Sequence, residues 1–133
     1  MLCASELADN REFEEMTMDA VKIDFAKMDG LVPGMVQDAK TGEMLMLGFL
    51  NEVSYAKTLE TGFVTFWSRT RQKLWMKGET SGNRLRVIEA STDCDNDALL
   101  FKVEVEGDGL VCHEGTVSCF TKPIAVGKDG ESK

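Results

Sequence analysis

Two apolar runs joined by a short polar segment stand out near the start of the chain. Residues 31–50 read LVPGMVQDAKTGEMLMLGFL, in which apolar residues dominate on both sides of DAKTG at residues 38–42. Asp, Lys, Thr and Gly in such a position favour a turn between two strands. The pattern therefore predicts a β-hairpin over residues 31–50.

A helix is expected directly after this hairpin. Within NEVSYAKTLETG, residues 51–62, the apolar residues recur at helical spacing. These residues are Val53, Tyr55, Ala56 and Leu59. Asn51 is a favourable N-cap, and Gly62 can end a helix because glycine adopts the left-handed conformation without strain. The pattern predicts one main helix between these two residues.

Three later segments are rich in β-branched and aromatic residues, which favour strands. They are FVTFWS at residues 63–68, RLRVIEAS at 84–91 and ALLFKVEVE at 98–106, and GDG at 107–109 marks a turn after the last. One main helix with mostly antiparallel strands is an α+β fold. We expect one domain over residues 21–122, after an acidic extension at 1–20 whose first sixteen residues form a short helix, and before a flexible polar tail at 123–133.

Composition narrows the class of protein. A chain of 133 residues suits a single domain. Its net charge of −8 argues against a general nucleic-acid binder, which would carry a basic excess. No apolar run approaches the roughly 18 residues of a membrane helix, and the acidic start does not resemble a signal peptide. We therefore expect a cytoplasmic protein that binds neither nucleic acid nor membrane.

The segment STDCDND at residues 91–97 places three carboxylates around one thiol. In an extended segment Asp93, Asp95 and Asp97 share one face, and Cys94 points to the other. Carboxylates suit magnesium or calcium, whereas a thiolate suits zinc. A calcium-binding EF-hand loop is excluded, because Ala98 stands where that loop needs glycine and the flanks are predicted strands. A metal-free turn rich in aspartate remains the alternative.

The segment CHEGTVSC at residues 112–119 supplies two further thiols. Cys112 and Cys119 together with Cys94 would leave one position of a tetrahedral zinc open for water, as in catalytic sites. His113 is the chain's single histidine, and neighbours on a strand point in opposite directions, so it is not expected to bind the same metal as Cys112. It is a candidate general acid or base. The thiol pair could instead serve a redox protein.

Basic residues are concentrated in one block of this acidic chain. Residues 69–86 contain six of the 15 basic residues and one acid, Glu79. Within the block, GETSGN at residues 78–83 has two glycines framing hydroxyl groups, which is how a loop offers donors to phosphate oxygens. The loop is not a Walker motif. A solvated basic face is the alternative interpretation.

Four motifs together resemble the phosphoribosyl-AMP cyclohydrolase family of histidine biosynthesis. They are GLVPGMVQDAKTGEMLMLGFLN, WSRTRQKLWMKGETSGN, DCDNDALL and CHEGTVSCF, within residues 30–120. The resemblance implies hydrolysis of N1-(5-phosphoribosyl)-AMP at the N1–C6 bond, which gives the formimino-carboxamide ribotide (ProFAR). It also implies an intertwined homodimer that uses zinc and magnesium. The chain is too short to include the pyrophosphohydrolase domain fused to many relatives, so the single-activity form is expected.

The resemblance also assigns roles to residues. It implies zinc ligation by Cys94, Cys112 and Cys119, with Cys94 from the other subunit, magnesium ligation by Asp93, Asp95 and Asp97, and catalysis by His113. The two phosphates of the substrate would account for the basic block. The expected substrate contacts are Trp67, Arg69, Arg71, Lys77, Glu79, Thr80 and Ser81. A non-catalytic, zinc-stabilised module that binds a phosphorylated nucleotide is the alternative function.

Overall fold

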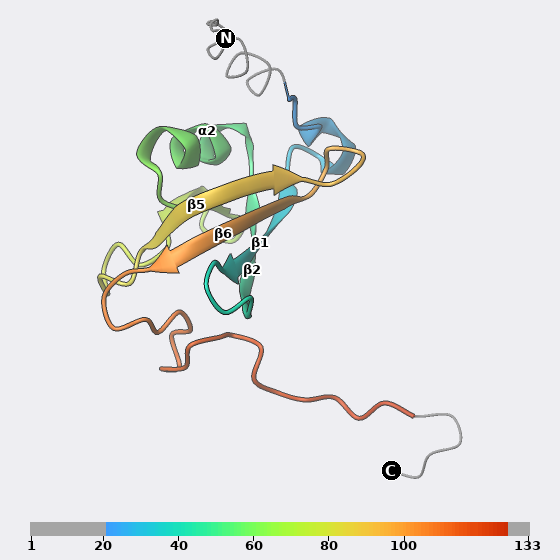
Figure 1. The fold of residues 1–133 in the computed structure, drawn as a ribbon. Coiled ribbons are helices and arrows are strands. Elements are labelled where there is room, and N and C mark those ends of the chain that lie inside the picture. The colour runs from blue at the N-terminus through green and yellow to red at the C-terminus, as the bar shows by residue number, and fades with distance from the viewer. Residues whose placement is uncertain (1–20, 128–133) are drawn as a thin grey trace, which may run out of the picture.

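The computed structural model describes residues 21–127 of the chain (Figure 1). In chain order the elements are η1 (Phe25–Met28), β1 (Val32–Asp38), β2 (Met44–Leu50), α2 (Glu52–Thr61), β3 (Thr65–Ser68), β4 (Lys73–Met76), β5 (Leu85–Thr92) and β6 (Leu99–Val105). The predicted α+β class is confirmed. The short helix expected in the first sixteen residues, and residues 128–133 of the tail, lie outside the described part.

A four-stranded sheet organises the molecule, with strand order β2-β1-β6-β5. The β1–β2 and β5–β6 pairs are antiparallel, so the predicted hairpin over residues 31–50 is confirmed. The central pair, β1 with β6, is parallel, which the sequence patterns did not predict. A second sheet contains β3 and β4 only, and β4 was not predicted as a strand. The two hairpins of the large sheet therefore meet along its parallel centre.

The predicted caps of α2 are confirmed, but the residues that the helix buries are not the apolar residues whose spacing predicted it. The Ser54 N–H donates to Asn51 Oδ1 at 2.9 Å, and Gly62 ends the helix with φ of 83°. Val53 is 59% exposed, whereas Ser54 and Thr58 are fully buried or nearly so. The Thr58 hydroxyl accepts the Thr65 N–H at 2.9 Å and thereby joins α2 to β3. Val53 and Leu59 of α2 are instead left largely exposed.

The core lies where the large sheet meets β3 and α2. Val36, Leu45, Phe66 and Phe101 are fully buried within it. Phe66 packs directly on β2, because a Cβ on Gly48 would come within 2.5 Å of the Phe66 ring. The β3–β4 hairpin can thus pack closely on the sheet because residue 48 is a glycine and has no side chain. No helix within residues 21–127 is long and apolar enough to cross a membrane.

Candidate functional site

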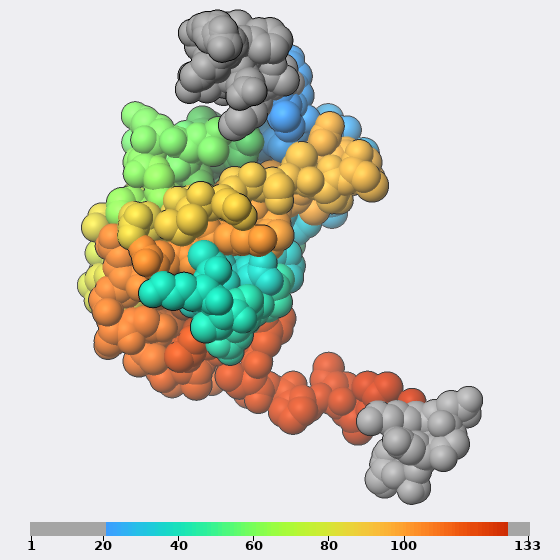
Figure 2. All heavy atoms as spheres, in the orientation of Figure 1, coloured from blue at the N-terminus to red at the C-terminus, as the bar shows by residue number. Residues whose placement is uncertain are grey.

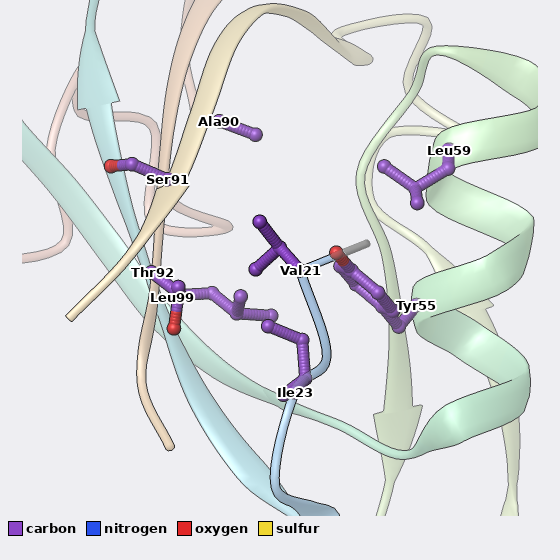
Figure 3. A pocket seen from close by; sticks show the side chains of 8 residues that line it. All are labelled: Val21, Ile23, Tyr55, Leu59, Ala90, Ser91, Thr92 and Leu99. Atoms are coloured by element: carbon purple, nitrogen blue, oxygen red, sulfur yellow. The ribbon is translucent and has the colours of Figure 1, made fainter. Parts of the chain in front are cut away.

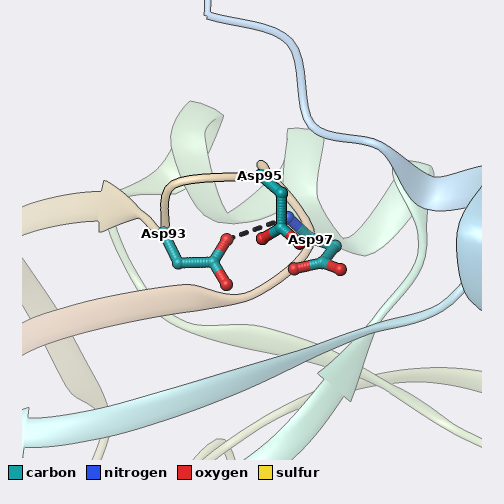
Figure 4. Close-up of side chains that lie close together, drawn as sticks. All are labelled: Asp93, Asp95 and Asp97. Atoms are coloured by element: carbon teal, nitrogen blue, oxygen red, sulfur yellow. Dashed lines mark hydrogen bonds between the residues drawn. The ribbon is translucent and has the colours of Figure 1, made fainter.

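The three aspartates converge in the loop between β5 and β6 (Figure 4). Their carboxylate oxygens lie within 4.8 Å of one another. The loop is a turn and not the extended segment expected from the sequence. Asn96 has φ of 63°, and the Asp97 N–H donates to Asp93 Oδ1 at 3.0 Å. The carboxylates meet because the chain reverses direction, and alternation along a strand is not the cause.

Lys27 of η1 places a positive charge in this cluster. Its Nζ lies 3.3 Å from Asp95 and 3.2 Å from Asp97. Hydrogen bonds to Asp97 and then to Asp95 raise the pKa of Lys27. The hydrogen bond with Asp97, followed by the one with Lys27, lowers the pKa of Asp95. Three neighbouring carboxylates are oxygen ligands that suit a hard divalent cation, so these aspartates fit magnesium, for which the Lys27 ammonium is a competitor.

The two thiols of the CHEGTVSC segment lie on either side of a turn that contains Gly115, so Cys112 and His113 are not neighbours on a strand as was assumed. The Cys112 N–H donates to the Thr116 carbonyl at 3.0 Å, and the Cys112 and Cys119 side chains lie close enough to shift each other's pKa. The backbone N–H of Glu114 is the main cause that lowers the pKa of Cys112. Desolvation and the neighbouring Cys112 raise the pKa of Cys119. The pKa values of the two thiols are thus shifted in opposite directions, and two neighbouring thiols are a donor set that fits zinc.

The β2 strand holds the end of this turn in place. The Cys119 N–H donates to the Leu45 carbonyl at 2.8 Å. The Ser118 hydroxyl, which is buried, donates to the Met44 carbonyl at 2.8 Å and accepts the Phe120 N–H at 3.0 Å. These bonds attach residues 118–120 to the sheet although the segment has no regular structure of its own. The position of Cys119 is thus set by the sheet.

Cys94 lies at the other end of the β5–β6 hairpin from Cys112 and Cys119. The eight residues of β5 separate the two ends by about 25 Å. Figure 2 shows the loop at residues 93–98 and the segment after β6 at separate ends of the molecule. Within residues 21–127, only the three aspartates bring three potential ligand atoms close together. One chain therefore does not assemble the three thiols expected to bind one zinc.

A cavity of about 480 Å³ lies between the loop at residues 77–83 and the turn that contains Cys112 and His113. Five of the predicted substrate contacts line it, namely Arg71, Lys77, Glu79, Thr80 and Ser81. Trp67 and Arg69 are not part of its lining. Trp67 is half-buried on β3, and the Arg69 guanidinium lies 4.3 Å from the centre of the Phe49 ring. The cavity thus gathers most of the basic loop around the single histidine.

Trp75 and Asn83 are among the residues that line this cavity without having been predicted as site residues. Trp75 is half-buried and also packs against the core. Asn83 ends the GETSGN motif and is buried. In the sequence, both residues lie next to the basic loop. That position alone does not tell a residue that lines a cavity from one that packs in the core.

A second cavity, of about 460 Å³, lies between α2, β5 and the segment before η1 (Figure 3). Its lining is mostly apolar and includes Val21, Tyr55, Leu59 and Leu99. It offers no charged group for a phosphorylated ligand. The polar cavity beside His113 is therefore the better candidate site.

Comparison of the sequence with known proteins shows the family of this chain. The sequence profile described as phosphoribosyl-AMP cyclohydrolase matches residues 46–121. A phosphoribosyl-AMP cyclohydrolase of Solibacter usitatus is 56% identical over 108 residues, which cover 81% of this chain and 85% of that protein. The chain belongs to the phosphoribosyl-AMP cyclohydrolase family. It is thus an enzyme of that type, and the resemblance read from the four motifs is confirmed.

Two further relatives show how this cyclohydrolase sequence is distributed. A phosphoribosyl-AMP cyclohydrolase of Desulfatibacillum aliphaticivorans is 56% identical over 104 residues, which cover 78% of this chain and 82% of that protein. The histidine biosynthesis bifunctional protein HisIE of Bacteroides thetaiotaomicron is 53% identical over 100 residues, which cover 75% of this chain and 48% of that protein. The cyclohydrolase profile includes every predicted site residue, whereas Lys27 lies outside it.

Proposed function

We propose that this enzyme opens the adenine ring of N1-(5-phosphoribosyl)-AMP at the N1–C6 bond and releases ProFAR. The observation that carries the proposal is the cavity in which His113 and Cys112 face the basic, hydroxyl-bearing loop at residues 77–81. One ligand can therefore hold its phosphates against the loop while its base reaches the histidine and the thiols. We assign this activity to residues 21–122 and propose a cytoplasmic location.

The loop supplies the phosphate contacts in this proposal. Lys77 and Arg71 provide positive charge, and Thr80 and Ser81 provide hydroxyl donors on the same side of the cavity. Gly78 has φ of 85°, so the chain turns sharply at the start of the loop. Charge-assisted hydrogen bonds of this kind are about twice as strong as neutral ones. They would fix one end of the substrate.

The thiols would hold zinc, and the aspartates would hold magnesium. Cys112 and Cys119 fit zinc because their side chains are adjacent and the pKa of Cys112 is already lowered, and Cys94 of a second copy would complete the set. Zinc bound by three thiolates supplies a Lewis acid that makes water a nucleophile near neutral pH. Asp93, Asp95 and Asp97 lie in the same loop as Cys94. In the shared site the loop of the second copy would thus bring its magnesium close to the substrate phosphates.

His113 would move the proton in the reaction. Substitution at N1 makes the adenine ring electron-poor, so C6 is open to attack by water. The oxygen of water stays on C6 as the carboxamide oxygen, the N1–C6 bond breaks, and N1 gains a proton. The exposed imidazole of His113 at the same cavity can take the proton from water and deliver it to N1.

A homodimer with shared sites follows from the same arrangement. Cys94 lies at the other end of the β5–β6 hairpin from the other two thiols, and the described residues of one chain do not bring the three together, so a zinc site with all three needs a second copy. The exposed apolar residues of α2 offer a surface for that copy, since Val53 is 59% and Leu59 57% exposed.

The test is turnover of N1-(5-phosphoribosyl)-AMP by the purified full chain with zinc and magnesium present. We expect ProFAR to form and to stop forming when a chelator removes zinc. Binding of the substrate without product would favour the non-catalytic nucleotide-binding module. Activity that survives metal removal and depends on a cycling Cys112–Cys119 pair would favour the redox protein. Either result contradicts the proposed reaction.

A further inference from the structure

Asn83 lies between the two sides of the polar cavity. It is only 8% exposed, although Ser81 and Gly82 immediately before it are exposed. The loop at residues 77–82 precedes it, and its side chain points away from that loop toward the segment that leads to Cys112. Burying a carboxamide costs folding free energy unless its donor and its acceptor both form hydrogen bonds. The hydrogen-bond partners of Asn83 therefore show what its burial achieves.

Both polar atoms of the Asn83 side chain are used on that second segment. Its Nδ2 donates to the Leu110 carbonyl at 2.9 Å. Its Oδ1 accepts the Asp108 N–H at 3.1 Å. A carboxamide supplies one donor and one acceptor at this spacing, whereas a carboxylate supplies acceptors only. Asn83 therefore binds a backbone carbonyl and a backbone N–H in a way that aspartate cannot reproduce.

The backbone at two glycines packs closely against Asn83. A Cβ on Gly107 would lie 1.9 Å from Asn83 Oδ1, and a Cβ on Gly78 would lie 2.3 Å from the Asn83 carbonyl oxygen. Both glycines have positive φ, 73° and 85°. The carboxamide is thus enclosed by backbone from both segments, which fixes the distance between them.

We propose that Asn83 is a positioning residue that sets the distance between the phosphate-binding loop and the reacting centre. Leu110, which Asn83 holds, lies two residues before Cys112 and three before His113 in the chain. The inference rests on the proposed function, because it assumes that the loop holds phosphate while His113 and the thiols act on the base. Misplacing reacting groups by about 1 Å can cost roughly 10²-fold in rate.

The test uses Asn83→Ala and Asn83→Asp in the full-length enzyme. We expect kcat to fall roughly 10- to 100-fold in both variants, with KM changed less than about threefold and zinc content retained. The aspartate variant keeps the Asp108 bond and the shape of the side chain but places a carboxylate oxygen against the Leu110 carbonyl. Asn51→Ala is the matched control, because it removes an equal carboxamide from the N-cap of α2. Its kcat should equal that of the wild type.

A second readout needs no substrate. In cobalt(II)-loaded protein, the thiolate absorption depends on how the ligands are oriented, which partners beyond the ligands control. We expect the spectrum to change in Asn83→Ala and to stay unchanged in Asn51→Ala. If Asn83 only stabilised the fold, the folded fraction of Asn83→Ala would keep the wild-type spectrum. An unchanged spectrum would therefore overturn the proposal.

The remaining outcomes are also decisive. A kcat within about threefold of wild type, or a raised KM at unchanged kcat, would show that Asn83 does not position the reacting centre. If Asn83→Ala does not fold, the near-isosteric Asn83→Asp decides by the same two measurements. Failure of the wild type itself to make ProFAR would instead refute the proposed function, and the positioning role with it.

Discussion

The separation of Cys94 from the other two thiols can be tested by mixing two inactive variants. Thiols that share one zinc lie about 4 Å apart, since each zinc–sulfur bond is about 2.3 Å. Within one chain, Cys94 and the other two thiols lie toward opposite ends of the β5–β6 hairpin, in which β5 is about 25 Å long. Cys94→Ser and Cys112→Ser should therefore each be inactive as homodimers, because each loses one ligand from every shared site.

Exchange of subunits between these two variants should restore a defined share of the activity. In a twofold-symmetric dimer with sites built across the interface, a mixed dimer collects both defects in one site and leaves the other intact. Random exchange of equal amounts makes about half of the dimers mixed, so about one quarter of wild-type turnover should return. Turnover is measured after exchange, and native mass spectrometry counts the mixed dimers.

The matched control mixes Cys112→Ser with Cys119→Ser. Both defects then lie on the same side of every shared site, so a mixed dimer has no intact site and no activity should return. Absence of recovery in the first mixture, with mixed dimers shown to be present, would refute the shared site. Equal recovery in both mixtures would show that the assay reports something other than reassembled zinc sites.

Three further changes test other parts of the site and fold. His113→Ala should keep zinc and fold but lose roughly 10²- to 10⁴-fold in turnover; near-wild-type kcat would remove His113 from the mechanism. Lys27→Met should bind magnesium roughly two- to fivefold more tightly by calorimetry, because a competing cation leaves the aspartates; weaker binding would contradict this. The Thr41 N–H is the main cause that lowers the pKa of Asp38, so its stabilisation is present above about pH 4 and is lost as pH falls through the lowered pKa. In urea unfolding, Asp38→Asn should thus be less stable than wild type near about pH 7, and the difference should shrink as the pH falls below about 4; a constant difference would contradict the assignment.

The elements that depend on neighbouring residues were predictable from the sequence. The caps of α2 and the β1–β2 hairpin rest on contacts within a few residues, for example Asn51 with Ser54. The buried face of α2 was not predictable, because Thr58 is buried through its bonds with Thr65, which joins a different element. Helical spacing identifies a helix, but the residues that pack against it decide which side is covered.

The sequence identified most of the residue types in the candidate site, but it did not show how the chain brings those residues together. Asp93, Asp95 and Asp97 were identified as one ligand set, yet the reason is a turn with Asn96 at positive φ and not strand alternation. Asn83 was missed because its role depends on Leu110, which is 27 residues away in the chain. Long-range bonds of this kind leave no local signature.

The parallel pairing of β1 with β6 has a consequence for how the chain reaches this structure. Gly34 pairs with Leu99, and Asp38 pairs with Val103, so the centre of the large sheet closes only after most of the chain has been synthesised. Contacts between distant residues form late, because the entropy of closing a long loop must be overcome first. Until then one edge of β1 has no partner, and unpaired strand edges promote association with other chains. Synthesis of residues 99–105 is therefore the step that ends the exposure of this edge, and variants that weaken β6 should aggregate during expression before they lose activity.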